Sequence, residues 1–152
     1  INTVDTTIDL NRYLGKWYQI AALPQVFSFN AKCVTAEYSL NADGSVKVVN
    51  KQITQDGSAQ EIVGRATVEP NSGNAKLRVR FFGQQPAEPN YWIVEIADDY
   101  SYAVVSDKNK FTWWILSRTP QMDETKVQDI ITRWAGFGVN MSLLQRTVQD
   151  CE

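Results

Sequence analysis

Short runs of alternating hydrophobic and polar residues cover most of the chain, and turn-forming residues separate them. Alternation is typical of β-strands, because successive side chains point to opposite faces of a sheet. The separators are rich in Asn, Asp, Gly and Pro, which accept the backbone angles of tight turns. With no helical pattern between the runs, this order predicts an antiparallel meander. The predicted strands are 15–22, 33–40, 45–54, 59–69, 74–83, 90–97, 101–106 and 110–118.

Eight strands in succession predict a closed all-β barrel with up-and-down topology, because an open sheet would expose two unpaired edges. Alternation then gives each strand an inner face. In 45–54, the face that carries Val46 and Val48 continues through Asn50 and Gln52. A solid core excludes such amides, since an unpaired buried amide costs about 1–3 kcal/mol. An eight-stranded barrel can hold one small molecule, so we expect a cavity whose wall includes these amides.

Alternation also assigns inner positions on two later strands, and most of them are apolar or aromatic. These positions are Leu77, Val79, Phe81, Trp114 and Leu116. Arg78 falls on the outer face. A wall of this kind, with a few amides, suits an apolar chain that carries a polar head.

One helix is predicted after the eighth strand, beyond Pro120. Its apolar residues recur at helical spacing and form a single stripe, which we expect to pack against the outside of the barrel. Asp123 is the predicted N-cap, and Gly136 the predicted end. A short ninth strand, 143–148, follows the helix. The apolar stripe consists of Val127, Ile130, Ile131 and Trp134.

Composition narrows the classes of function that remain. A chain of 152 residues without repeats predicts one domain over 1–152. The 15 basic and 17 acidic residues are spread along the chain, so nothing indicates a nucleic-acid partner. No apolar run is long enough to span a membrane as a helix.

The sequence contains no histidine, which removes the common catalytic and metal-binding arrangements. A Ser-His-Asp or Cys-His nucleophile cannot be assembled, and neither can a His-ligated zinc or haem site. We therefore expect a protein that is not an enzyme and that needs no cofactor or metal.

The two cysteines, Cys33 and Cys151, lie near opposite ends of the chain. They could be two buried thiols, because cysteine packs as a small hydrophobic residue. However, the segment around Cys151 is polar and offers little burial by itself. We favour a disulfide that ties the tail to an early strand, which implies an oxidising compartment.

Three segments resemble the sequence motifs of the lipocalin family. GKWY at 15–18 fits the Gly-x-Trp-Tyr motif of the first strand, and DDYSYAVV at 98–105 resembles the motif between the sixth and seventh strands. WWILSRTP at 113–120 resembles the third motif, whose arginine is Arg118. Within the family, the chain is similar to the bacterial outer-membrane lipocalins and apolipoprotein D. The resemblance implies an eight-stranded antiparallel lipocalin barrel with one C-terminal α-helix outside and a short ninth strand.

The resemblance implies a structural role for Gly15, Trp17, Tyr18 and Arg118 at the closed end of the barrel. In the family, the tryptophan fills the base and the arginine lies across its ring. A desolvated cation–π contact of this kind is worth about 1–2 kcal/mol. Trp17 and Arg118 are therefore expected to hold the fold together without touching the ligand.

The resemblance also implies a disulfide and a ligand-binding set. Cys33 and Cys151 match a disulfide of the family. The ligand-binding residues match lining positions of apolipoprotein D-like members or follow from the alternation. This set is Tyr38, Asn50, Gln52, Val79, Phe81, Tyr91, Trp114 and Leu116.

Glu95 departs from the family pattern. Its parity with Tyr91 and Ile93 places it inside the barrel, where small residues usually stand near the base. Either Glu95 pairs with an interior cation, or a bulge turns it outward. We favour a bulge or contact with solvent.

Four connections of the meander are predicted to frame the open end of the barrel. The first carries the apolar side chains Val26, Phe27 and Phe29, which could form a lid or simply pack against the rim. The ligand would enter here and leave its polar head near Gln52 and the mouth. The four connections are 23–32, 55–58, 83–89 and 106–110.

These features predict a carrier of a small hydrophobic or amphipathic ligand, such as a fatty acid or a lysophospholipid. The alternative is a carrier of a bilin or retinoid chromophore, and a lipid- or carotenoid-modifying enzyme ranks last. The resemblance implies an extracytoplasmic protein, secreted, periplasmic or associated with an outer membrane. It leaves open peripheral association with a membrane, and a monomer or a homodimer.

Overall fold

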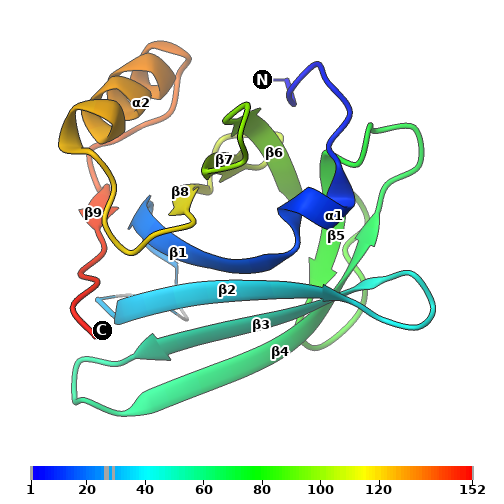
Figure 1. Ribbon diagram of the computed structural model, residues 1–152, viewed down its shortest axis with the longest axis horizontal. Helices are drawn as coiled ribbons and strands as arrows, with labels where there is room; N and C mark the ends of the chain where they lie inside the picture. The colour runs from blue at the N-terminus through cyan, green and yellow to red at the C-terminus, as the bar shows by residue number, and fades with distance from the viewer. Residues whose placement is uncertain (1, 26–27, 29, 152) are drawn as a thin grey trace.

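Eight antiparallel strands close into a barrel in the order in which they follow along the chain (Figure 1). The computed structural model describes residues 2–25, 28 and 30–151, so the lid expected from Val26, Phe27 and Phe29 lies outside the described residues. The strands are β1 Gly15–Ala22, β2 Lys32–Leu40, β3 Val46–Ile53, β4 Ala59–Val68, β5 Lys76–Arg80, β6 Tyr91–Ile96, β7 Tyr102–Ser106, β8 Trp113–Ser117 and β9 Gln145–Arg146; the helices are α1 Leu10–Tyr13 and α2 Glu124–Gly136.

Strand β1 closes the barrel because it pairs with β8 on one side and with β2 on the other. The β1–β2 ladder runs from Gly15, opposite Tyr38, to Tyr18, opposite Thr35. The predicted closed, eight-stranded antiparallel barrel is therefore confirmed. Helix α1, which was not predicted, lies at one end of the barrel (Figure 1), and we call this the closed end.

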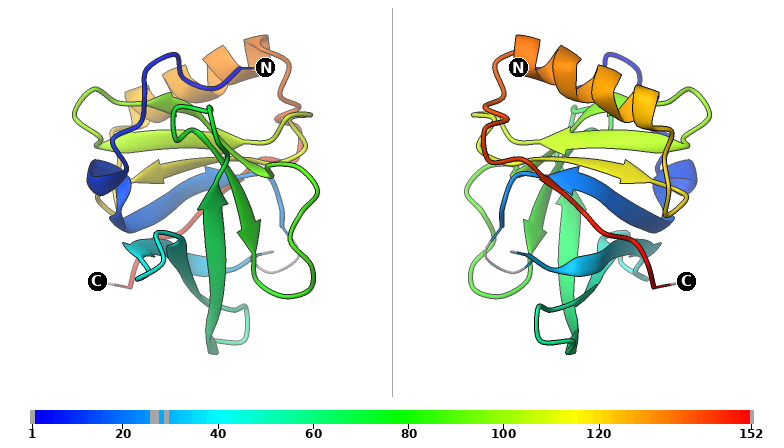
Figure 2. Two further views of the ribbon diagram at one scale, coloured as in Figure 1. Left: turned by 90° about the vertical axis from the view of Figure 1, so that its right-hand side faces the viewer. Right: turned by 90° about the vertical axis from the view of Figure 1, so that its left-hand side faces the viewer.

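The C-terminal tail fills the seam where β1 and β2 separate (Figure 2, right). The Thr147 amide donates to the Ile20 carbonyl at 2.9 Å, and the Cys33 amide donates to the Val148 carbonyl at 2.8 Å. Between them, the buried Gln149 side chain donates to one carbonyl of each strand at 2.8 and 2.9 Å. The tail thus replaces the missing half of the β1–β2 ladder.

A disulfide fastens this tail, as predicted. It joins Cys33 and Cys151, which are 118 positions apart in sequence and whose Cα atoms lie 6.1 Å apart. Lys32 and Asp150 form an ion pair beside it at 3.2 Å. Both cysteines of the chain are therefore used in structure.

Helix α2 covers the outside of the barrel wall, as predicted (Figure 1). It buries Val127, Ile130 and Trp134 against wall residues that include Trp113 and Ile115. A second apolar cluster fills the closed half of the barrel interior. The wall strands β6, β7 and β8 are thus covered on both faces.

The ends of α2 differ in detail from the prediction. Asp123 occupies the N-cap position, but its side chain makes no capping hydrogen bond. The helix ends at Gly136, but Phe137 is the C-cap and the left-handed residue is Gly138, with φ of +103°. Gly138 has the left-handed backbone conformation that often follows the end of a helix, and a glycine adopts it without steric cost.

Glu95 faces outward because the β6–β7 pairing shifts register between Ile93 and Glu95. Its carboxylate accepts hydrogen bonds from the Tyr102 hydroxyl at 2.6 Å and from Trp134 Nε1–H at 2.7 Å. Arg133 of α2 adds an ion pair at 2.5 Å. The favoured interpretation of a bulge is correct, and the outward carboxylate anchors α2 to the wall.

Three predicted strands are shorter than expected, and in two of them side chains take over backbone hydrogen bonds. β5 ends at Arg80, since the Asn90 amide pairs with both backbone groups of Val79 at 2.8 and 3.0 Å. β8 begins only at Trp113, because Asp107 organises the preceding turn. The ninth strand is reduced to Gln145–Arg146.

Candidate binding cavity

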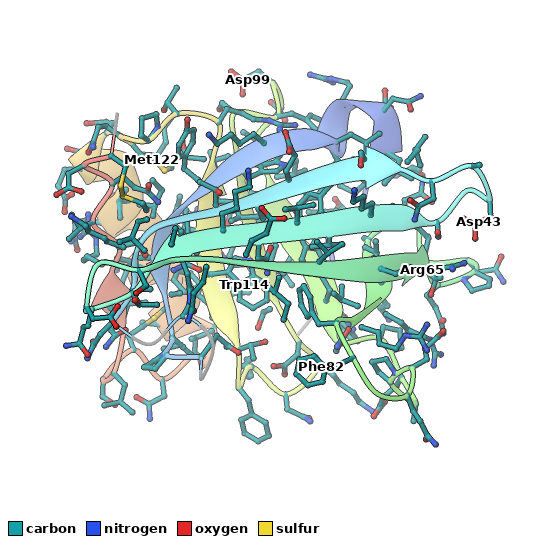
Figure 3. The ribbon with its side chains drawn as sticks, turned by 90° about the horizontal axis from the view of Figure 1, so that it is seen from below. Asp43, Arg65, Phe82, Asp99, Trp114 and Met122 are labelled. Carbon is teal, nitrogen blue, oxygen red and sulfur yellow. A yellow bond between two sulfur atoms is a disulfide. The ribbon has the colours of Figure 1, made fainter. Side chains whose placement is uncertain are left out.

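A cavity of about 820 Å³ occupies the half of the barrel away from α1 and opens at the end that we call the mouth. Its walls come from the inner faces of the strands, as the alternation predicts, and Figure 3 shows Trp114 inside the barrel. Seven of the predicted ligand-binding residues line it, namely Tyr38, Asn50, Val79, Phe81, Tyr91, Trp114 and Leu116.

Gln52 is the predicted site residue that does not line the cavity. It is buried, and its Nε2 donates to Gln60 Oε1 on the neighbouring strand at 2.9 Å. The amide is therefore engaged within the β3–β4 hairpin. Asn50 and Thr35 supply polar groups to this part of the wall instead.

The closed end is sealed by Trp17 and Arg118, as the motif resemblance implies. Trp17 is fully buried, and the Arg118 guanidinium carbon lies 3.7 Å from the centre of its ring. The guanidinium donates to the carbonyls of Arg12, Leu14 and Lys16 at 2.6, 3.0 and 3.0 Å. Neither side chain lines the cavity, so both act on the fold.

Gly15 makes this packing possible. Its φ is +103°, and a Cβ atom there would lie 3.3 Å from Arg118 Nη1. A glycine tolerates both the left-handed backbone and the close approach. Tyr18, the last residue of the first motif, is half-buried on β1 beside the Lys16 ammonium, which lies 4.9 Å from its ring centre.

Tyr38 and Tyr91 form the floor of the cavity and Tyr13 lies behind them, and we call the three residues the tyrosine cluster. The Tyr91 hydroxyl is hydrogen-bonded to the Tyr13 hydroxyl at 2.7 Å and to the Tyr38 hydroxyl at 2.9 Å. Burial away from water raises the pKa of Tyr38 to about 12 and raises the pKa values of Tyr13 and Tyr91 as well. All three are therefore neutral phenols at neutral pH.

The tyrosine cluster belongs to a longer column of aromatic rings. Trp17 packs on Tyr13 with ring centres 5.2 Å apart, and Tyr13 stacks on Tyr38 at 5.8 Å. Tyr91 then contacts Tyr38 at 6.1 Å and Trp114 at 5.9 Å, both edge to face. Aromatic contact thus runs unbroken from the closed end to the cavity wall.

Phe81 fills its place on the wall because Gly64 lies beneath it. A Cβ atom at Gly64 would lie 2.6 Å from Phe81 Cδ1 and 2.8 Å from the Arg80 carbonyl oxygen. No side chain fits there without displacing the ring or the backbone. Gly64 therefore sets the position of one cavity wall.

The mouth is framed by connections that carry exposed aromatic side chains. Phe82 and Phe111 are 82% and 78% exposed and belong to the cavity lining; Figure 3 shows Phe82 at the edge of the molecule. Lys108 and Glu88 form an exposed ion pair at 3.8 Å between two of these connections. Of the four predicted connections, 55–58 contributes no described residue to the lining.

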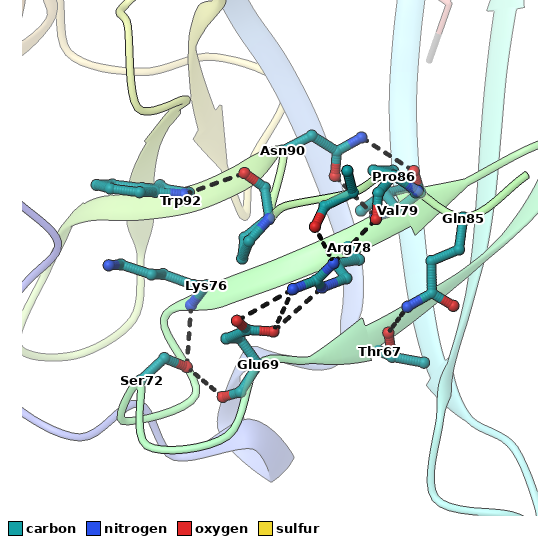
Figure 4. Close-up of polar contacts among 12 residues, drawn as sticks. Thr67, Glu69, Ser72, Lys76, Arg78, Val79, Gln85, Pro86, Asn90 and Trp92 are labelled. Atoms are coloured by element: carbon teal, nitrogen blue, oxygen red, sulfur yellow. Dashed lines mark hydrogen bonds and ion pairs between the residues drawn. The ribbon is translucent and has the colours of Figure 1, made fainter.

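Arg78 holds one of these connections from outside the barrel (Figure 4). Its guanidinium forms a two-point ion pair with Glu69, with both hydrogen bonds at 3.1 Å. Its Nη1 also donates to the carbonyls of Pro86 and Ala87 at 2.9 and 2.6 Å. Arg78 faces outward as predicted, but it also positions the loop that carries Phe82.

Asp107 organises the other connection that carries an exposed aromatic. Its carboxylate accepts from the amide and hydroxyl of Thr112 at 2.7 and 2.6 Å and from the Asn109 amide at 2.7 Å. Partial burial opposes ionisation, but these hydrogen bonds outweigh it and lower the pKa of Asp107. The charged carboxylate therefore fixes the turn that presents Phe111.

Sequence reasoning missed several residues on which the cavity depends. Tyr13 lies in a helix of four residues, too short for a periodic pattern. Gly64 and Asn90 act through cross-strand contacts whose partners depend on register. The role of Asp107 could have been predicted from the sequence, because an aspartate in a turn such as SDKN often accepts hydrogen bonds from the backbone amides that follow it.

The described residues contain one cluster of potential metal ligands, beside the tail. Cys33, Asp150 and Cys151 lie close enough together to hold an ion, but both sulfurs are bonded to each other and supply no thiolate. None of the described helices has the length and apolar character needed to cross a membrane. The cavity is therefore the candidate site.

Comparison with known proteins identifies relatives over most of the chain. Residues 8–149 match the family model of the lipocalin-like domain. The chain is 39% identical over 140 residues to apolipoprotein D of Bos taurus, covering 85% of this chain and 72% of the relative. It is 37% identical over 136 residues to the outer membrane lipoprotein Blc of Vibrio cholerae, covering 87% and 78%. Lobster apocrustacyanin A1 has a similar structure, with a TM-score of 0.71 and 25% identity over 93% of this chain and 79% of that one.

Proposed function

Because this chain belongs to the lipocalin family, whose members bind small hydrophobic ligands, we propose that it binds one amphipathic lipid inside the barrel. The ligand class is a fatty acid or a lysophospholipid. The observation that carries the proposal is the cavity of about 820 Å³, which joins apolar and aromatic walls to a polar mouth. Ligand cavities of drug-sized molecules range over about 300–1,000 Å³, so this one suits a single long chain.

The proposed ligand lies with its chain inside and its head at the mouth. The chain would contact Val79, Phe81, Trp114 and Leu116, with Asn50 beside it. Lys108 is the one basic side chain among the described lining residues, and it lies on a connection at the mouth. An anionic head placed there stays solvated and can share Lys108 with Glu88, whose ion pair with it is exposed.

The expected affinity follows from the apolar surface that the ligand buries. Ten methylenes at about 0.8 kcal/mol each give a gross gain of about 8 kcal/mol, from which the ordering of the chain is subtracted. Because about 8 kcal/mol alone corresponds to about 1 μM, the sum supports a dissociation constant in the micromolar range.

A bilin or retinoid chromophore is the second candidate, and the aromatic column beside the cavity favours it. Flat conjugated ligands stack on rings such as Tyr91 and Trp114. The purified protein would then show a visible or near-ultraviolet absorption band beyond that of its own aromatic residues. At the level of the family, the relatives are binding and transport proteins, which supports a role without catalysis.

The proposed location is extracytoplasmic: secreted, periplasmic or associated with an outer membrane. The disulfide supports this, because such bonds persist in oxidising compartments. One relative is an outer membrane lipoprotein. Exposed Phe82 and Phe111 at the mouth support peripheral contact with a lipid surface, where the ligand would enter or leave.

A fluorescence titration tests the proposed function. Hexadecanoic acid should quench tryptophan emission in the native protein, and Trp114→Phe should remove much of that signal. The matched control is Trp92→Phe, because Trp92 packs on the outer side of the wall, away from the cavity. Equal quenching in both variants, or none in the native protein, would contradict a ligand beside Trp114.

A further inference from the structure

The tyrosine cluster contains more hydrogen-bond donors than it can use. Three phenol hydroxyls carry three protons, and the chain Tyr13–Tyr91–Tyr38 contains two hydrogen bonds. Within the described part of the chain, none of the three hydroxyls makes another hydrogen bond. One O–H group is therefore left without an acceptor among the described residues, whichever way the chain is oriented.

This surplus donor is deeply buried. Tyr13, Tyr38 and Tyr91 are 4%, 8% and 7% exposed. Leaving a buried donor without an acceptor costs free energy. A ligand group that supplies an acceptor at the floor is therefore favoured. Tyr38 and Tyr91 line the cavity, whereas Tyr13 lies behind them. The surplus donor can therefore be presented to the cavity from Tyr38 or Tyr91.

We propose that the tyrosine cluster is a binding site for a neutral carbonyl oxygen at the leading, deeply buried end of the ligand. This inference rests on the proposed function, and it extends the proposed ligands to apolar chains that also carry a ketone or ester carbonyl at the end that enters first. The carbonyl accepts the surplus O–H, and the rest of the molecule fills the apolar cavity above it.

The charges around the floor favour a neutral acceptor over a carboxylate. The nearest guanidinium, that of Arg118, lies below Trp17 and is bound to three backbone carbonyls. Lys108 is at the opposite, open end. A carboxylate on the floor would have one donor and no counter-ion, and burying a charge in that state is very unfavourable. An ionised head therefore stays at the mouth.

A matched pair of ligands tests the proposal. Hexadecanoic acid and 15-oxohexadecanoic acid differ by one ketone at the far end of the chain. Each is titrated into the native protein and into Tyr38→Phe/Tyr91→Phe, with Tyr18→Phe as the control because Tyr18 lies outside the cavity lining. In the double variant, we expect the affinity for the keto acid to fall about tenfold relative to the affinity for the plain acid, because one buried hydrogen bond is lost. Tyr18→Phe should leave the ratio unchanged.

Infrared spectroscopy supplies a readout that a purely structural role would not move. The ¹³C-labelled ketone of the bound keto acid should absorb at a lower frequency in the native protein than in dry hydrocarbon. This measurement needs no variant, so it holds even if the double variant does not fold. An unshifted band, or the same ligand ratio in the native and double-variant proteins, overturns the carbonyl site while plain acid still binds. If neither acid binds the native protein, the proposed function itself fails.

Discussion

At the scale of single residues, the closed end depends on the contact between Trp17 and Arg118. Trp17→Ala should lower the free energy of unfolding by about 3–5 kcal/mol, because it deletes a buried aromatic ring. Arg118→Ala should also destabilise, since it removes the ring contact and three hydrogen bonds to carbonyls. Urea denaturation measures both. Protein that remains folded should bind lipid normally, and lost affinity at an unchanged melting temperature would show that Trp17 is a binding residue.

Gly64 offers a residue-scale test of the cavity wall. Gly64→Ala should displace Phe81 or the Arg80 backbone and destabilise by about 1–3 kcal/mol, as overpacking does. Ligand affinity should change with it, because Phe81 lines the cavity. The matched control is Gly136→Ala, where a Cβ atom meets open space and helix propensity favours alanine. Similar stability losses in the two variants, by thermal denaturation, would contradict the packing argument.

Residue-level prediction from sequence succeeded where one strand's own pattern decides the outcome. Alternation placed Asn50, Phe81 and Trp114 on the inner face, and the motifs identified Trp17 and Arg118. It failed for Gln52, whose partner Gln60 depends on the β3–β4 register. The outward turn of Glu95 required a bulge, which sequence suggested but could not locate.

At the scale of elements, the tail and its disulfide complete the barrel seam. Cys33→Ser/Cys151→Ser should lower the free energy of unfolding by about 2–4 kcal/mol, because the bond closes a long loop in the unfolded chain. The amides of Cys33 and Thr147 should exchange hydrogen faster, since they pair across the seam. Exchange measured by mass spectrometry checks this. Unchanged stability and unchanged protection would mean that Gln149 and the strand pairing hold the tail without the disulfide.

Elements were predictable from sequence in kind and order but less so at their ends. All eight barrel strands and α2 were found, because each has several periods of its pattern. The ends of β5 and β8 shifted because Asn90 and Asp107 side chains take over backbone hydrogen bonds. Helix α1 escaped notice, since four residues give only one helical turn.

At the scale of the whole molecule, the tyrosine cluster links stability to alkaline pH. Burial raises the pKa of Tyr38 to about 12, whereas the pKa of a tyrosine in the unfolded chain is about 10. Between these values the unfolded state releases protons that the folded state keeps, so stability must fall as pH rises. Urea midpoints at about pH 9 and pH 11 should show this fall. Tyr13→Phe/Tyr38→Phe/Tyr91→Phe should show a smaller one, and an equal fall would contradict the assignment.

The central claim is that the barrel holds one amphipathic chain, and a chain-length series measured by calorimetry tests it most directly. Saturated fatty acids of increasing length should bind one per protein. Affinity should rise up to about fourfold per added methylene and level off once the cavity of about 820 Å³ is full. A lipid carrier requires this dependence. If no long-chain amphiphile binds with a dissociation constant below about 100 μM, or if affinity does not depend on chain length, the account is wrong.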